Sequence, residues 1–271
     1  MASGPREEGS PSGALHQDAL EAARFPTRCG TGAPWTVAGR DGMRYGELTP
    51  AQDELFRTWV EKGHARPWKE LKEGVFLAGE LVAKFFPAPS NVRGMLREST
   101  AARAAKLARW IDPIPTPRPV LAVAGVGPEE SDSLWVSEYI PGPSFESAWD
   151  ADPAAREALP AFLAEMHERG IYHGDLHPGN LIWNDGRLVL IDVTALRRGL
   201  HLLFARKLAD AQWARLLLYL GDVEALRACY STYADLRGWE SAEAGWRRVV
   251  DHTRRLMQRR KVLPPRAPRL D

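Results

Sequence analysis

The sequence predicts an α+β fold with two lobes, and three observations lead to that prediction. Short strand-like apolar runs, separated by glycine and proline, dominate the first half of the chain. Helical spacing of apolar residues dominates the second half. Between the halves, Pro141-Gly142-Pro143 interrupts both patterns. We therefore expect a small strand-rich lobe, a larger helical lobe and a site in the cleft at their junction.

Composition restricts the classes of function. The chain has 271 residues, 44 % of them apolar, which is enough for a sizeable core, and a formal net charge of +1. A near-neutral chain does not attract polyanions through its overall charge, so no nucleic-acid partner is expected. Cys29 and Cys229 lack the spacing of a zinc site or disulfide framework, which indicates reduced thiols. We expect a cytoplasmic protein with at most a peripheral contact at the inner membrane face, because no apolar run is long enough to span a bilayer.

The first lobe should begin with a helix, since Thr49 can cap it and Pro50 suits its first position. Gly79-Glu80 separates two apolar runs and predicts a hairpin there. In order, the expected elements are a helix over 50–61, strands in 74–79 and 81–86, a helix from 91 or 92 to 111, a proline-rich linker, and strands over 120–126 and 134–140.

The second lobe should be mostly helical, with one hairpin around Asp185-Gly186. Its expected elements are helices over 154–169, 203–219, 222–236 and 240–260 and short strands at 181–183 and 188–191. The expected organisation is an extension over 1–45, disordered up to about Leu15, a nucleotide-binding lobe over 46–140, a catalytic lobe over 141–262 and a tail over 263–271.

The chemistry is expected in the segment from His173 to Asp192. Asp175 and Asn180 lie five residues apart across a Pro-Gly turn, and Asp192 ends the hairpin that follows. The turn and the hairpin can bring these three oxygen-bearing side chains to one point, and such ligands suit Mg²⁺. One carboxylate could deprotonate an alcohol while the other two groups hold a metal on nucleotide phosphates. The competing interpretation is a polar turn that only joins two elements.

The string from His173 to Asn180, HGDLHPGN, resembles the catalytic loop of protein-kinase-like enzymes in the form found in aminoglycoside and choline phosphotransferases. The resemblance implies a kinase-like fold, ATP as phosphate donor and Mg²⁺ as cofactor. It assigns Asp175 as catalytic base, with Asn180 and Asp192 as metal ligands. His173 is expected to be a scaffold residue, whereas His177 is open between loop stabilisation and contact with metal or substrate.

Lys84 lies in Leu-Val-Ala-Lys-Phe-Phe, which resembles the strand whose lysine contacts the α- and β-phosphates of ATP. Glu98 would be its helical partner, although the neighbouring Arg97 offers that carboxylate another ion pair. The alternative for Lys84 is a solvent-facing position on an alternating strand. If the kinase-like fold is right, Glu138 and Tyr139 would offer main-chain hydrogen bonds to the adenine ring.

Three features depart from the protein-kinase pattern. No G-x-G-x-x-G precedes Lys84, so the phosphate-covering loop is shortened or replaced. Gly174 replaces the arginine that reads a phosphorylated activation loop, which argues against that form of regulation. Asp192-Val193-Thr194 replaces Asp-Phe-Gly, and no Ala-Pro-Glu follows. The substrate platform of a eukaryotic protein kinase is therefore not expected.

Further features resemble the bacterial lipopolysaccharide core kinases that act on Kdo and heptose. They are Ile114-Pro115-Thr116-Pro117, the run Ser137-Glu138-Tyr139-Ile140-Pro141-Gly142, and Trp213-Ala214-Arg215-Leu216. A basic segment follows the metal site and could hold an acidic sugar or lipid phosphate, or it could be a solvated helix face. Its members are Arg197, Arg198, His201, Arg206 and Lys207.

The function expected from this resemblance is an ATP-dependent kinase of a sugar hydroxyl, with a lipopolysaccharide-core-like acceptor that is either free or lipid-linked. Two alternatives stay open. One keeps the chemistry and changes the acceptor to another small molecule or a protein. The other is a nucleotide-binding pseudokinase or scaffold, which the absence of a glycine-rich loop favours.

Overall fold

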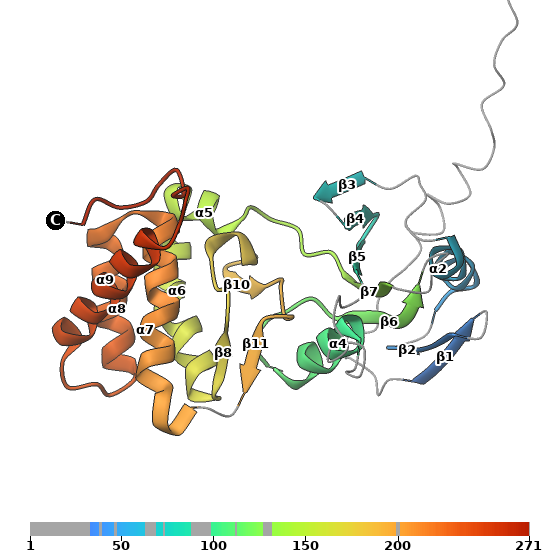
Figure 1. Ribbon diagram of the computed structural model, residues 1–271, viewed down its shortest axis with the longest axis horizontal. Coiled ribbons are helices and arrows are strands. Elements are labelled where there is room, and N and C mark those ends of the chain that lie inside the picture. Colours follow the sequence, from blue (N-terminus) through green and yellow to red (C-terminus); the bar gives the residue numbers. More distant parts are fainter. Residues whose placement is uncertain are drawn as a thin grey trace, which may run out of the picture. The chain divides into compact units, whose positions relative to one another are not determined.

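The computed structural model describes residues 33–37, 40–45, 48–62, 69–72, 74–87, 99–111, 113–126, 132–198 and 201–270. These residues form two compact units (Figure 1). One comprises the described residues up to Arg109 together with Arg118–Tyr139, and the other comprises Trp110–Pro117 and the described residues from Ile140 onward. Disorder near the N-terminus and the pairing of Glu98 lie outside the described residues.

The first unit is built on a seven-stranded antiparallel sheet in the order β1-β2-β6-β7-β5-β4-β3. Its strands are β1 (Ala33–Val37), β2 (Arg40–Arg44), β3 (Lys69–Lys72), β4 (Val75–Ala78), β5 (Leu81–Phe86), β6 (Pro119–Val126) and β7 (Asp132–Glu138). The expected β4–β5 hairpin is present, and Gly79 in its turn has a φ of 60°. The sheet also takes in β1 and β2, so the expected extension over 1–45 contributes two strands instead of lying wholly outside the lobe.

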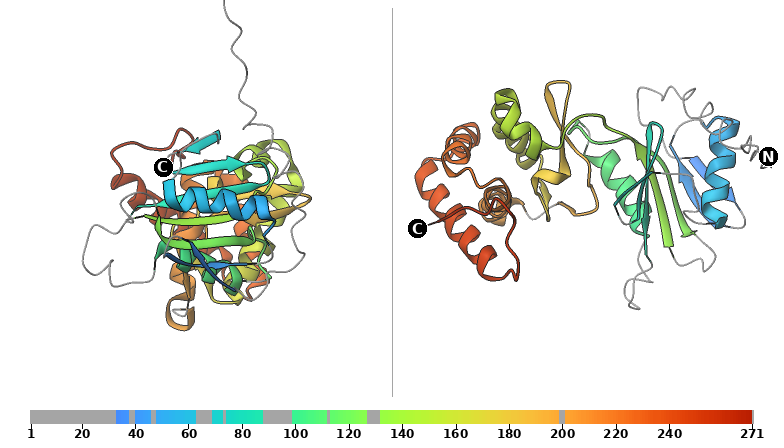
Figure 2. Two further views of the ribbon diagram at one scale, coloured as in Figure 1. Left: turned by 90° about the vertical axis from the view of Figure 1, so that its right-hand side faces the viewer. Right: turned by 90° about the horizontal axis from the view of Figure 1, so that it is seen from above.

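Two helices cover opposite faces of this sheet, as the right-hand view of Figure 2 shows. They are α2 (Pro50–Lys62) and α4 (Thr100–Trp110). α2 starts where Thr49 predicts. The Thr49 hydroxyl accepts from the Gln52 amide at 3.2 Å, and the Gln52 side-chain oxygen accepts from the Thr49 amide at 2.9 Å. Phe56, Trp59 and Val60 of α2 are buried against the sheet and form the core of this unit.

The second unit is mostly helical, with α6, α7, α8 and α9 packed side by side (Figure 1). Its elements are α5 (Phe145–Ala151), α6 (Pro153–Glu168), β8 (Ile171–His173), the 3-10 turn η1 (Pro178–Asn180), β9 (Leu181–Asn184), β10 (Arg187–Leu190), β11 (Leu196–Arg198), α7 (His201–Leu220), α8 (Val223–Leu236) and α9 (Ala242–Gln258). A sheet-based first unit and a helical second unit confirm the α+β class. None of the described helices is long and apolar enough to cross a bilayer.

Two short ladders position the segment expected to carry the chemistry. β9 and β10 pair as a hairpin whose turn residues, Asp185 and Gly186, have φ of 46° and 74°, as a tight Asp-Gly turn requires. β8 pairs with β11, which brings His173 opposite Leu196. The proline-rich linker joins this framework, since Leu190 donates to the Pro115 carbonyl and Thr116 Oγ1 donates to the Leu190 carbonyl.

Candidate active site

Asp175 lies in the turn between β8 and η1, where its main chain is fixed and its carboxylate is open. Its N–H donates to His173 Nδ1 at 3.2 Å, and its carbonyl accepts from Asn180 Nδ2 at 3.0 Å. The side chain keeps 61 % of its exposure, and its closest cation is Arg215, with Nε 3.7 Å from Oδ1. A carboxylate presented in this way can accept a proton from a molecule in solution.

His173 connects this turn to the metal-ligand candidate Asp192. The ring is buried, and its Nε2 lies 2.5 Å from the Asp192 carbonyl while Nδ1 accepts from Asp175. Nε2 must therefore carry the proton, and burial lowers the pKa of the ring, which keeps it neutral. Both nitrogens are used within the protein, so the geometry agrees with a scaffold role.

His177 has a local role that the geometry makes explicit. Its Nδ1 accepts from the Gly179 amide at 3.1 Å and so caps η1, and its ring lies 5.2 Å from that of Tyr219. These contacts hold the Pro178-Gly179 turn between Asp175 and Asn180. Of the two roles left open by the sequence, loop stabilisation is the one these contacts provide.

Asn180 and Asp192 are brought together by a main-chain hydrogen bond, from the Ile191 amide to the Asn180 carbonyl at 3.0 Å. The Asn180 amide nitrogen donates to the Asp175 carbonyl, so the amide oxygen is the side-chain atom that could bind a metal. Asp192 Oδ1 accepts from the amide and hydroxyl of Thr194 at 3.0 and 2.7 Å. One carboxylate and one amide oxygen fit Mg²⁺, which commonly binds one or two carboxylates together with waters and substrate phosphates.

Thr194 holds the Asp192 carboxylate, a role that the triplet Asp192-Val193-Thr194 did not by itself indicate. Its two bonds to Oδ1 fix the rotation of the carboxylate. Arg197, which the sequence places in the basic segment, lies beside Gly174. A Cβ added at Gly174 would lie 3.2 Å from Arg197 Nε, so the guanidinium of β11 occupies the space next to this glycine.

A buried series of polar side chains supports β8 and the turn that holds Asp175. Gln212 Nε2 donates to the His173 carbonyl at 3.0 Å, and Gln212 Oε1 lies 2.8 Å from His167 Nε2. His167 Nδ1 lies 2.7 Å from the Tyr233 hydroxyl. Because Gln212 Oε1 can only accept, His167 carries its proton on Nε2 and accepts from Tyr233. Side chains of α6, α7 and α8 thus converge on β8.

Burial shifts the pKa values of His167 and Tyr233 strongly. The pKa of His167 falls to about 4, chiefly because burial penalises the imidazolium. Burial also raises the pKa of Tyr233 well above its usual range. Every member is therefore neutral near pH 7. The apolar spacing of the sequence predicts His167 as a helical core position, but it gives Gln212 and Tyr233 no separate role. Their signal in the sequence is a polar side chain on an apolar helical face.

The nucleotide-binding residues expected in the first unit have a mixed outcome. Lys84 lies on β5 opposite Trp135, with Nζ 5.2 Å from the centre of the indole ring, while Glu98 lies outside the described residues. The amides of Glu138 and Tyr139 donate to the carbonyls of Arg118 and Glu80. Those two N–H groups are therefore used within the sheet and are not available to an adenine ring, which corrects part of the expected role.

The Glu138 side chain is also engaged within this unit. It forms an ion pair with Arg118, with Nε 3.0 Å from Oε2 and Nη2 3.2 Å from Oε1. This two-point contact ties the end of β7 to the residue that precedes β6.

Residues 142–200 match the model of the phosphotransferase enzyme family, APH. The match includes Asp175, Asn180 and Asp192. No curated protein matches the chain.

Solved structures with similarity include WaaP in complex with acyl carrier protein, at 18 % identity and a TM-score of 0.44, covering 92 % of this chain and 96 % of that one. A choline/ethanolamine kinase family protein from Mesorhizobium loti has 15 % identity and a TM-score of 0.49, with coverage of 70 % and 76 %. The bifunctional kinase-methyltransferase WbdD has 15 % identity and a TM-score of 0.46, with 69 % of this chain covered. The chain spans about half of WbdD, 52 %.

Proposed function

We propose that this protein transfers the γ-phosphate of ATP to a hydroxyl group. The observation that carries the proposal is the arrangement of Asp175, Asn180 and Asp192. The carboxylate of Asp175 faces solvent, and the Asp175 carbonyl accepts from the Asn180 side chain. The hydrogen bond from the Ile191 amide to the Asn180 carbonyl brings Asp192 next to Asn180. The match of residues 142–200 to a phosphotransferase family model supports the same chemistry.

In the proposed reaction, Asp175 receives the acceptor hydroxyl next to its exposed oxygens. Asp175 takes the proton as the hydroxyl oxygen attacks the γ-phosphorus, and the bond between that phosphorus and the bridging oxygen of ADP breaks. The products are ADP, a phosphate ester and a protonated Asp175, which returns its proton to solvent. His173 keeps the turn in place because its two nitrogens join Asp175 to Asp192.

Asn180 and Asp192 would hold Mg²⁺ through the amide oxygen and the carboxylate. The ion supplies charge neutralisation at the nucleotide phosphates when it is bound. Thr194 holds the Asp192 carboxylate in one rotation. In the first unit, Lys84 is proposed to contact the α- and β-phosphates, with Glu98 as its partner.

For the acceptor we propose a sugar hydroxyl of the lipopolysaccharide-core type. The support is the resemblance of the Ile114–Pro117, Ser137–Gly142 and Trp213–Leu216 segments to core kinases. The cationic Arg215 beside Asp175 favours an acidic acceptor over a cationic one. Other small molecules remain the alternative acceptors, and a nucleotide-binding module without turnover remains the alternative function.

The test is incubation of the purified chain with ATP, Mg²⁺ and a panel of sugars, aminoglycosides and generic protein, followed by mass spectrometry of each acceptor. Asp175→Asn and Asp192→Asn should each lower turnover by at least about 100-fold with an unchanged circular dichroism spectrum. Asp185→Asn is the matched control, since it makes the same chemical change in the exposed β9–β10 turn.

Near-normal turnover in either site variant would refute the mechanism. A thermal-shift titration with ATP and Mg²⁺ separates the two classes of function. Binding without phosphate transfer to any acceptor would favour the nucleotide-binding module.

A further inference from the structure

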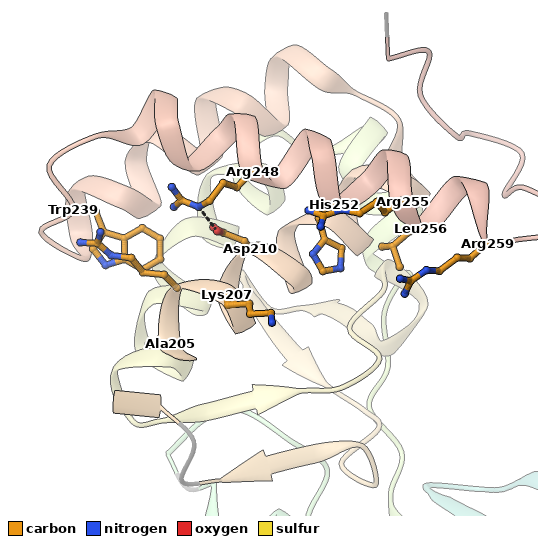
Figure 3. A pocket seen from close by; sticks show the side chains of 10 residues that line it. Ala205, Lys207, Asp210, Trp239, Arg248, His252, Arg255, Leu256 and Arg259 are labelled. Carbon is orange, nitrogen blue, oxygen red and sulfur yellow. Dashed lines mark hydrogen bonds and ion pairs between the residues drawn. The ribbon is translucent and has the colours of Figure 1, made fainter. Parts of the chain in front are cut away.

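A hollow of about 910 Å³ lies between α7 and α9 in the second unit, away from the residues assigned above (Figure 3). Its walls carry six basic side chains that arrive from both helices. They are Arg206, Lys207, Arg248, His252, Arg255 and Arg259. Trp239 lies in the wall near the start of α7, where it stacks under Arg206 with Cζ 5.3 Å from the ring centre.

The one acidic residue of the hollow is already neutralised. Asp210 is buried, and its Oδ1 accepts from the Tyr230 hydroxyl at 2.9 Å while Oδ2 accepts from Arg248 Nε at 2.7 Å. Figure 3 shows this pair at the wall, with Lys207 below it on α7. Asp210 and Arg248 cancel in charge, so the remaining arginines and lysine leave the hollow with a formal charge of about +4.

These remaining cations are available to a ligand. The side chains of Lys207 and Arg259 make no hydrogen bond or ion pair with any residue that the structure describes, and both residues are exposed. Arg255 donates only to the Asp251 carbonyl of its own helix, at 3.1 Å. Like charges gathered around one concave space repel each other, and an anion in that space offsets the repulsion. Guanidinium groups match phosphate and carboxylate oxygens in geometry.

The proposed catalytic base pairs with a residue of α7, the helix that forms one wall of the hollow. His252 in the wall of the hollow has a pKa lowered first by burial and then by the positive charges of Arg255 and Arg215. Arg215 is the residue whose Nε is 3.7 Å from Asp175 Oδ1. On α7 it follows Asp210 by five residues, which corresponds to roughly 7–8 Å along the helix axis.

We propose that this hollow binds the phosphate or carboxylate group of an anionic sugar acceptor and so directs a hydroxyl of the same molecule to Asp175. The substrate class is a small sugar that already carries negative charge. Binding of the anion depends only on the hollow, whereas delivery of the hydroxyl rests on the proposed function.

The binding test is isothermal titration calorimetry in magnesium-free buffer with glucose 6-phosphate, galacturonate, glucose and inorganic phosphate as probes. Glucose 6-phosphate or galacturonate should bind at least tenfold more tightly than glucose. The double variant Arg255→Gln/Arg259→Gln should lose that difference. Arg247→Gln is the control for loss of positive charge from α9, because it removes one charge, against two in the double variant, from an exposed position that is not part of the hollow.

The proposal would be overturned by no binding of either anionic sugar, by equal affinity for glucose, or by unchanged binding in the double variant. Binding of inorganic phosphate as tight as that of the sugars would also overturn it, since it would mark a simple phosphate site. Preferential, Arg255- and Arg259-dependent binding to phosphatidylglycerol vesicles over both sugars would reassign the hollow to a membrane surface and refute the sugar acceptor.

Turnover separates this inference from the proposed function. If a neutral sugar is phosphorylated and the double variant has a normal KM, the inference fails and the function stands. If anionic sugars bind through Arg255 and Arg259 but no acceptor is phosphorylated, the function fails, and with it the delivery step, while the anion site stands. A raised KM for an anionic sugar, with little change in kcat, supports both.

Discussion

His167 makes the stability of this protein depend on pH in a direction that can be calculated. Its pKa is about 4 in the folded chain against a usual 6.5, because the ring is buried between Gln212 and Tyr233. A depressed pKa means that the unfolded chain takes up the proton first as pH falls. The stabilisation is complete above pH 6.5 and is lost progressively down to about pH 4.

The magnitude follows from the difference between the two pKa values. One pKa unit corresponds to about 1.4 kcal/mol, so His167 contributes a loss of about 2 kcal/mol between pH 7 and pH 5 and about 3 kcal/mol by pH 4. Chemical denaturation followed by circular dichroism, repeated from pH 8 to pH 5, measures the free energy of unfolding across this range.

Two variants isolate the contribution of the imidazole. His167→Gln removes the titrating group and should flatten the curve between pH 7 and pH 5 by about 2 kcal/mol relative to the wild type. Tyr233→Phe removes the hydroxyl that faces His167 Nδ1 but keeps the titrating ring, so it should be less stable at pH 7 yet keep the wild-type slope. If wild type and His167→Gln lose the same free energy between pH 7 and pH 5, the burial argument is wrong.

Three further predictions concern a glycine, the polar chain and the metal ligands. Gly221→Ala should cost at least about 2 kcal/mol more than Gly238→Ala in denaturation, because both have positive φ but an added Cβ at Gly221 would overlap the Arg266 carbonyl oxygen; equal costs would contradict this. Gln212→Leu should lower the free energy of unfolding by about 1–3 kcal/mol and also reduce kcat, since it leaves the His173 carbonyl and His167 without their partner; unchanged kcat would show that the chain does not position the turn. Thr194→Val should raise the Mg²⁺ concentration for half-maximal activity about tenfold, with the ATP-independent melting temperature as control.

Local signals explain which elements could be predicted from the sequence. Thr49-Pro50 places the start of α2, and Asp185-Gly186 places the β9–β10 turn, because capping and tight turns depend on neighbouring residues. α5 was missed although Ser144 caps it, with its hydroxyl accepting from the Ser147 amide. Here the signal was present in the chain, and the proline-rich context obscured it.

Non-local pairing explains what could not be predicted. β8 and β11 have three residues each and exist because they pair across more than twenty positions of sequence, so neither shows a strand pattern of its own. β2 is likewise recognisable only from its pairing with β6, and β1 only from its pairing with β2. Short strands depend on their partners more than on intrinsic propensity.

The site shows the same division. The order and spacing of Asp175, Asn180 and Asp192 were visible in one segment, whereas the support from His167 and Gln212 comes from two separate helices. The basic segment after Asp192 also supplies only some of the cations around the hollow. Arg206 and Lys207 line the hollow, but the other arginines come from α9, about forty residues later.

The hydrogen bond from Thr116 in the proline-rich linker to the Leu190 carbonyl has a consequence for folding during synthesis. Its partners are 74 residues apart, and the whole β6–β7 pair of the other unit lies in the sequence between them. The buried side chains of Ile111 and Ile114 belong to the second unit but leave the ribosome before those strands. A fragment beginning at Ile140 would therefore lack part of its own core. During synthesis, the second unit cannot finish folding until residues 110–117, which are made earlier, pack against it.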